Sequence, residues 1–210
     1  MEKLIKIRLD KVILEGMLVV PTDATLLVIF AHGSGSSRLS PRNNFVASIL
    51  QKAKIGTLLI DLLTKNEDEI YETRFDINLL TERLSQIARW IKEHPETQNL
   101  ALGLFGASTG AAAALKTAAQ LPKEITAVVS RGGRPDLAID ELKNVTAPTL
   151  LIVGGDDTEV IALNRIAFAK LKSVKRIEIV PGATHLFEEP GTLEKVAELA
   201  TAWFKQYNKV

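Results

Sequence analysis

A serine flanked by two glycines lies at residues 106–110, which read Gly-Ala-Ser-Thr-Gly. The apolar run 100–105 before it has the length of a buried strand, and the alanine-rich stretch 111–120 after it favours a helix. A serine in a sharp strand-to-helix turn has its hydroxyl held clear of the backbone, where it can attack a carbonyl carbon. A Cβ at Gly106 or Gly110 would clash with the turn or the adjoining strand. The spacing therefore predicts that Ser108 is a nucleophile on an elbow between strand and helix.

A serine hydroxyl becomes reactive only when an imidazole accepts its proton and a carboxylate orients that imidazole. Asp156 and Asp157 follow the apolar run 149–153, and His185 follows the run 176–180. His185 is the only histidine after the acidic pair, so we expect it to be the base. Asp157 is the favoured acid, although either aspartate could instead cap the following helix. The chain order Ser, Asp, His is the order of the α/β-hydrolases.

Negative charge that develops on a substrate carbonyl oxygen needs hydrogen-bond donors already in place. The backbone N–H of Thr109, directly after the serine, is one expected donor. The second is expected in the Gly/Ser-rich loop 32–37, where Ser34 is our choice and Gly35 the alternative. This loop could instead cradle a phosphate, but it has neither the Lys-Ser/Thr ending nor the spacing of a P-loop. His32 is expected to be structural, because a base is expected much later in the chain.

The elements that must position these residues alternate between strands and helices. The stretches 3–9 and 11–20 read as an antiparallel hairpin at a sheet edge. Further strands are expected at 25–31, 55–61, 100–105, 125–130, 149–153 and 176–180, and helices at 41–53, 77–93, 111–120, 160–171 and 193–207. This alternation predicts an α/β fold with a mostly parallel sheet of about seven to eight strands and helices on both faces. Such sheets bind ligands at the carboxyl ends of their strands, which is where the serine, the acid and the histidine lie.

Composition narrows the class of protein. A length of 210 residues fits a single domain, 1–210, that buries its core without a disulfide or a metal. The absence of cysteine excludes a thiol nucleophile and a cysteine-based zinc site. The 26 basic and 25 acidic residues give a net charge of +1, which creates no field for nucleic acid. We see no secretory segment and no membrane-spanning run, so we expect a cytoplasmic protein with no nucleic-acid or membrane partner.

Five segments together resemble the dienelactone hydrolase-like branch of the α/β-hydrolase superfamily. They are 32–38, 106–110, 130–136, 154–157 and 181–190. The resemblance covers nearly the whole chain and implies the α/β-hydrolase fold, a triad of Ser108, Asp157 and His185, ester-type substrates, and no cofactor or metal. The same segments resemble a bacterial subgroup sometimes fused to a phosphoribosyltransferase domain, a domain that we do not expect within these 210 residues.

Two departures from the family bear on the substrate. Dienelactone hydrolases proper use a cysteine nucleophile, whereas this chain has Ser108, which puts the lactone substrate itself in doubt. Only the polar segment 62–76 could serve as a cap, so the cap is expected to be minimal.

Candidate substrate-binding residues lie on the same loops. Arg38, Arg131 and Arg134 could clamp a carboxylate, and we expect at least one of them near Ser108. The alternative is that these arginines, with Arg42, form salt bridges to acids such as Asp61, Asp136 or Glu188. An apolar wall is expected from Leu62 and Phe187, with Leu63 and Leu186 beside them. The alternative is that each of these side chains is ordinary packing.

The favoured function is a serine hydrolase that cleaves small carboxylic esters, lactones or thioesters through an acyl-serine intermediate. One alternative is a binding protein that kept the hydrolase fold and lost turnover. Another is an acyltransferase that uses the same triad with a different acceptor. The expected partner is a small ester, and the sequence leaves open whether the protein is a monomer or a homodimer.

Overall fold

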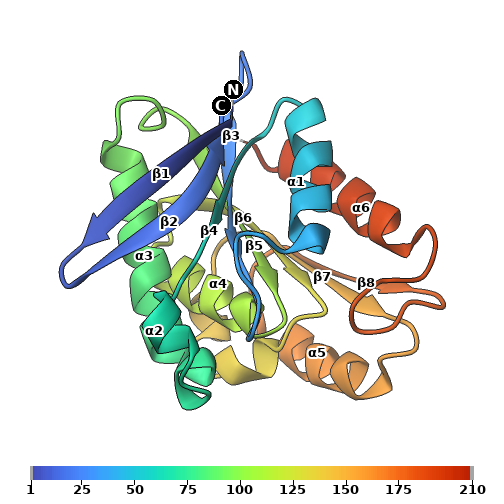
Figure 1. The fold of residues 1–210 in the computed structure, drawn as a ribbon. Helices are drawn as coiled ribbons and strands as arrows, with labels where there is room; N and C mark the ends of the chain where they lie inside the picture. Colours follow the sequence, from blue (N-terminus) through green and yellow to red (C-terminus); the bar gives the residue numbers. More distant parts are fainter. Residues whose placement is uncertain (1, 209–210) are drawn as a thin grey trace.

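Eight strands form one sheet in the order β1-β2-β4-β3-β5-β6-β7-β8 in the computed structural model, which describes residues 2–208 (Figure 1). The strands are β1 (Glu2–Leu9), β2 (Val12–Val19), β3 (Leu26–Ala31), β4 (Gly56–Ile60), β5 (Ala101–Ala107), β6 (Ile125–Arg131), β7 (Thr149–Gly154) and β8 (Lys175–Val180). The β1–β2 hairpin is antiparallel and joins β4 antiparallel, whereas the pairings from β4 through β8 are all parallel. The predicted α/β-hydrolase fold with an antiparallel edge hairpin is confirmed.

Helices cover both faces of this sheet (Figure 1). They are α1 (Pro41–Lys52), α2 (Lys65–Asp68), α3 (Ile77–Glu93), α4 (Thr109–Gln120), α5 (Thr158–Lys170) and α6 (Thr192–Gln206), with 3₁₀ turns η1 (Glu72–Phe75), η2 (Pro135–Ala138) and η3 (Leu142–Asn144). One layer is formed by α1 and α6, and the other by α3, α4 and α5. The wholly apolar central strands are buried on both faces by these layers, as is typical of parallel sheets.

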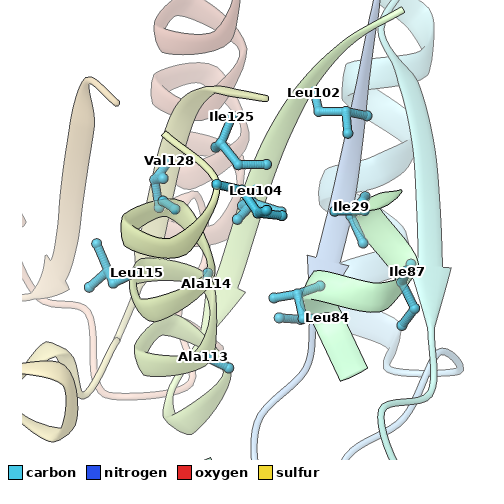
Figure 2. Packing of buried hydrophobic residues seen from close by; sticks show 14 of the residues in the cluster. Ile29, Leu84, Ile87, Leu102, Leu104, Ala113, Ala114, Leu115, Ile125 and Val128 are labelled. Carbon is cyan, nitrogen blue, oxygen red and sulfur yellow. The ribbon is translucent and has the colours of Figure 1, made fainter. Parts of the chain in front are cut away.

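Alternate residues of the central strands point into two separate cores. In β3, Leu27 and Ile29 pack toward α3 and α4, whereas Val28 and Phe30 pack toward α1 and α6. Figure 2 shows Ile29 and its neighbours on β5 and β6 facing side chains of α3 and α4. Because successive side chains of a strand point to opposite faces of the sheet, each central strand contributes side chains to both cores.

Local signals set the ends of the helices. Ser40 accepts the N–H of Asn43, and Pro41 occupies the first turn of α1. The helix α4 begins at Thr109, two residues before the expected start, because it follows the strand β5 with only Ser108 between them. The helix α5 likewise begins at Thr158, directly after Asp157.

The segment 62–76, between β4 and α3, contains α2 and η1. Thr64 and Glu67 form a capping box that starts α2. Arg83 of α3 donates to the carboxylate of Glu67 and to the carbonyl oxygen of Leu62 at 3.0 Å. The hydrogen bond from Arg83 lowers the pKa of Glu67 to about 2. This short segment is therefore anchored to the body of the fold through α3.

The two edge strands carry charged side chains. Lys6 and Arg8 lie exposed on β1, and Arg176 pairs with Glu178 on β8. Within residues 2–208, no helix combines the length and the apolar character that crossing a bilayer requires.

Candidate active site

Ser108 lies at the junction of β5 and α4 with φ 50° and ψ −121°, a conformation rare for a residue with a side chain. A Cβ on Gly106 would lie 2.7 Å from the backbone nitrogen of Ala111, and one on Gly110 would lie 2.5 Å from the carbonyl oxygen of His32. Both glycines are therefore required by close backbone approach, as the sequence predicted. The geometry is that of a nucleophile elbow.

Asp157 and His185 meet beyond the carboxyl ends of β7 and β8. The Nδ1 atom of His185 lies 2.7 Å from Oδ2 of Asp157. Asp157 stands at the N-cap of α5, yet its side chain caps no helical N–H. Asp157 therefore does not cap α5, the alternative that the sequence left open, and its carboxylate contacts the imidazole of His185 instead. Nδ1 donates to the carboxylate, which leaves Nε2 free to accept a proton.

Backbone contacts between neighbouring loops bring these two residues together. The N–H of Asp156 donates to the carbonyl oxygen of Ala183 at 3.0 Å, and the N–H of Gly155 donates to that of Val180 at 2.8 Å. Glu189 accepts the N–H and the hydroxyl of Thr184, which closes the turn that carries the histidine. The loops after β7 and β8 therefore behave as one hydrogen-bonded unit.

The turn after β6 touches both the serine and the histidine. The N–H of Ser108 donates to the carbonyl oxygen of Arg131 at 3.2 Å, and the N–H of Arg134 donates to that of Ser108 at 3.0 Å. Between them lies Gly132, where a Cβ would stand 3.5 Å from ring atoms of His185. The imidazole thus packs against the turn that is bonded to the serine.

The loop after β3 packs directly on the elbow. A Cβ on Gly33 would lie 3.0 Å from the Cβ of Ser108. The N–H of Ser34, the expected oxyanion donor, donates at 2.9 Å to the side-chain Oγ1 of Thr109. This differs from the prediction of a donor waiting for substrate, because a neighbouring hydroxyl already accepts that N–H.

His32 is buried at the start of the same loop and has a structural environment. Its Nδ1 donates to the carbonyl oxygen of Gly33 at 3.0 Å, and its Nε2 accepts the N–H of Leu62 at 3.1 Å. Burial lowers the pKa of His32 below its ordinary value, so the ring is held neutral. His32 therefore joins the loop after β3 to the start of the segment 62–76.

Two of the three candidate substrate-binding arginines are held by carboxylates of the protein. Arg38 pairs with Asp61 and with Glu15, the latter at 2.8 Å. Arg134 pairs with Asp136 at 2.8 Å. The salt-bridge alternative raised by the sequence therefore describes both side chains.

Arg131 differs from these two because it is buried without a carboxylate partner among the described residues. The residue is 4% exposed, and its guanidinium donates to Oδ1 of Asn43 at 3.2 Å and lies 5.9 Å from the ring centre of Phe187. Burial, together with the charge of nearby Arg42, lowers its pKa to about 10. Arg131 thus connects β6, α1 and the loop that carries His185.

The expected apolar wall is not formed by the residues chosen for it. Leu62 and Phe187 are 0% and 1% exposed, and both pack in the core. Leu62 belongs to the core between the sheet and α3 and α4, and Phe187 to the core beneath α1 and α6. Leu186 remains exposed beside His185, and Leu63 lines a cavity of about 360 Å³ between β2, the loop 36–39 and the segment 62–68.

Sequence reasoning missed two features of the site. The first is the hydroxyl of Thr109, which could have been noticed because a polar side chain directly follows the serine. The second is the role of Gly132, whose φ of +52° allows the turn beneath the imidazole. The Gly132-Gly133 pair indicates a turn, but its contact with His185 joins residues distant in the chain and has no local signal.

Comparisons with known proteins bear on the family and the fold. The model of the dienelactone hydrolase family matches residues 46–208. A crystal structure of dienelactone hydrolase from Anabaena variabilis is 54% identical, with a TM-score of 0.98 over 100% of this chain and 99% of that one. An α/β serine hydrolase without a lid, from Xanthomonas campestris, is 16% identical with a TM-score of 0.79 and shares the fold over 100% of this chain and 96% of its own.

Two curated relatives from strains of Mycobacterium tuberculosis are 55% identical over 189 residues and carry a phosphoribosyl transferase name. The match covers 90% of this chain but 43% of each relative, so the chain spans less than half of their length. The family model matches most of the chain, over a range that contains Ser108, Asp157 and His185. The chain therefore belongs to the dienelactone hydrolase family.

Proposed function

We propose that this protein is a serine hydrolase that cleaves small carboxylic esters, lactones or thioesters through an acyl-serine intermediate. The observation that carries the proposal is the 2.7 Å contact between His185 and Asp157, on loops that border the elbow of Ser108. A nucleophile, a base and a carboxylate that orients the base are the three parts that this chemistry needs.

The proposed reaction begins when Ser108 Oγ attacks the substrate carbonyl carbon and Nε2 of His185 takes the hydroxyl proton. The N–H of Thr109 and the positive end of α4 stabilise the oxyanion. Collapse of the tetrahedral intermediate expels the alcohol or thiol, which receives the proton from His185. Water then attacks the acyl-serine by the same steps in reverse, and Asp157 stabilises the imidazolium each time.

The substrate class rests on the family and on the site. The Anabaena relative is named for a lactone hydrolase, and the exposed Leu186 offers apolar contact beside the histidine. We do not propose phosphoribosyl transfer for this chain. That name belongs to relatives more than twice as long, and the residues that meet here suit acyl chemistry.

The proposal is tested by measuring hydrolysis of p-nitrophenyl acetate by the parent protein and by Ser108→Ala. Removal of the nucleophile should lower kcat by on the order of 10³-fold or more, because the triad acts as a unit. Asp157→Asn should retain Ser108 but lose the correct orientation of His185, with a large fall in kcat. Equal rates for the parent and Ser108→Ala would contradict the mechanism.

A covalent readout separates a hydrolase from a silent binding protein. Brief mixing with a fluorophosphonate should add the mass of the phosphonyl group to Ser108, and Ser108→Ala should remain unmodified. Added alcohol acceptors then test acyl transfer, because a transferase would form the new ester in preference to the free acid.

A further inference from the structure

The side-chain oxygen of Thr109 occupies a position that the proposed reaction needs for an oxyanion. It accepts the N–H of Ser34 at 2.9 Å. Any oxygen that accepts this N–H must lie near the same place, because hydrogen bonds are restricted in distance and direction. A substrate oxygen and Thr109 Oγ1 therefore compete for one donor.

The backbone around this donor has little room to move. A Cβ on Gly33 would lie 3.2 Å from the carbonyl oxygen of Ala107, and one on Gly110 would lie 2.5 Å from that of His32. The loop and the first turn of α4 are thus packed backbone against backbone. Rotation about the Cα–Cβ bond of Thr109 is the smallest motion that frees the N–H of Ser34. Side chains occupy staggered χ1 wells, so this rotation can end in another staggered well.

The hydroxyl proton of Thr109 is available for a new hydrogen bond. Across residues 2–208, Thr109 Oγ1 takes part in a single hydrogen bond, in which it is the acceptor. The residue is 4% exposed, so its proton lies in a site largely closed to water. The backbone N–H of the same residue points toward the oxyanion by construction of the elbow.

We propose that Thr109 donates its side-chain hydroxyl to the oxyanion, as a third donor beside the backbone N–H groups of Thr109 and Ser34. In the resting protein the oxygen keeps the N–H of Ser34 hydrogen-bonded. When substrate enters, the side chain rotates, the N–H of Ser34 turns to the substrate oxygen, and the hydroxyl donates to that same oxygen. This inference rests on the proposed serine hydrolase function and adds one catalytic residue to it.

The test compares Thr109→Val with Thr109→Ser in steady-state hydrolysis of p-nitrophenyl acetate. Valine keeps the shape of threonine and replaces the hydroxyl with a methyl group. We expect kcat to fall about tenfold or more with KM little changed, because loss of one oxyanion donor acts on the transition state. Serine keeps the hydroxyl and should stay within a few-fold of the parent.

A matched control lies on the same helix. Thr117 is also buried in α4, and its hydroxyl donates to the carbonyl oxygen of Thr81 away from the elbow. Thr117→Val should leave kcat unchanged. Thermal melting of each variant shows whether a fall in kcat reflects unfolding.

Inhibition by a boronic acid provides a second readout, because its adduct with Ser108 is a tetrahedral anion. Its affinity should weaken in Thr109→Val in parallel with kcat/KM. A kcat for Thr109→Val equal to or above that of the parent would overturn the inference, since the hydroxyl would then be only an occupant of the site. Ser108→Ala distinguishes failure of the hydrolase proposal from failure of the Thr109 inference. If Ser108→Ala stays active, both fail. If it is inactive, the result for Thr109→Val decides the inference alone.

Discussion

Ser108 has a backbone conformation that a residue without a side chain would adopt more easily. Its φ of 50° places the Cβ close to the backbone, at a typical cost of about 1–3 kcal/mol. The neighbouring elements hold the turn in this form. The carbonyl oxygen of Arg131 accepts the N–H of Ser108, and the carbonyl oxygen of Ser108 accepts the N–H groups of Arg134 and Ala111. Strain at the nucleophile is therefore balanced by hydrogen bonds around it.

Replacement of Ser108 by glycine should stabilise the fold while it removes the nucleophile. Glycine relieves the strain, offset in part by about 0.5–1 kcal/mol of added backbone freedom in the unfolded chain. We expect the free energy of unfolding of Ser108→Gly to exceed that of Ser108→Ala by about 1 kcal/mol, because alanine retains the Cβ. Urea denaturation followed by circular dichroism measures the difference. A glycine variant no more stable than the alanine variant would show that the turn is unstrained.

The residues of the candidate site could be predicted from the sequence more fully than the contacts between their side chains. Ser108, Asp157 and His185 were selected from residue type, chain order and position after strands, and the last two lie in contact. Side-chain direction was beyond reach, because it depends on partners distant in the chain. The 2.9 Å contact between Ser34 and Thr109 joins residues 75 positions apart, and no local pattern records it.

At the scale of elements, His32 links the loop after β3 to the backbone at Leu62. This link requires a neutral ring, since Nε2 must accept the N–H of Leu62. Because burial lowers the pKa of His32 from 6.5, the unfolded chain takes up a proton at a higher pH than the folded protein does. The contribution to stability is unchanged above pH 6.5 and declines as the pH falls below it.

The variant His32→Gln should remove this part of the pH dependence. We expect the parent to lose unfolding free energy between pH 6.5 and pH 5 faster than the variant, although the variant is less stable at pH 7.5. Denaturant titrations at several pH values give both slopes. Parallel slopes would mean that His32 is not the titrating group.

The ends of helices could be predicted where the chain has residues that start or stop a helix. Ser40 and Pro41 mark the start of α1, and His94 with Pro95 marks the end of α3. The segment 62–76 reads only as polar, and its order comes from Arg83 on α3, which holds the carboxylate of Glu67. Such long-range ion pairs are invisible to local periodicity.

At the scale of the whole molecule, the last helix packs against the middle of the sheet. A Cβ on Gly103 of β5 would lie 2.7 Å from Cε1 of Phe204 on α6 and 3.3 Å from Cγ2 of Val28. Phe204 is 0% exposed, so it has no space into which it can retreat. The helix α6 is therefore in close contact with the central strand β5.

Gly103→Ala should destabilise the protein by about 1–3 kcal/mol through overpacking. The double variant with Phe204→Leu should lose less than the sum of the two single changes, because the smaller side chain makes room for the added methyl group. Thermal melting of the parent, the two single variants and the double variant measures the three losses of stability. Additive losses would show that the two residues do not share the space.

The overall topology was the most predictable level, because strands and helices alternate regularly and parallel sheets allow few arrangements. The apolar runs of β3, β5 and β7 require burial on both faces of the sheet, which predicts a layer of helices on each face. The sequence left open whether Leu62 and Phe187 line the site or pack in the core, and both pack in the core. That choice is made by the packed loops and not by hydropathy.

The charges on the two edge strands bear on how copies of this protein can meet. Unpaired edges invite a second chain to add a strand, and charged side chains oppose this by repulsion and by the cost of burying them. With Lys6 and Arg8 on β1, and Arg176 and Glu178 on β8, both ends of the sheet resist continuation into a neighbouring molecule. Copies that associate are therefore expected to do so through helices or loops, leaving each sheet separate.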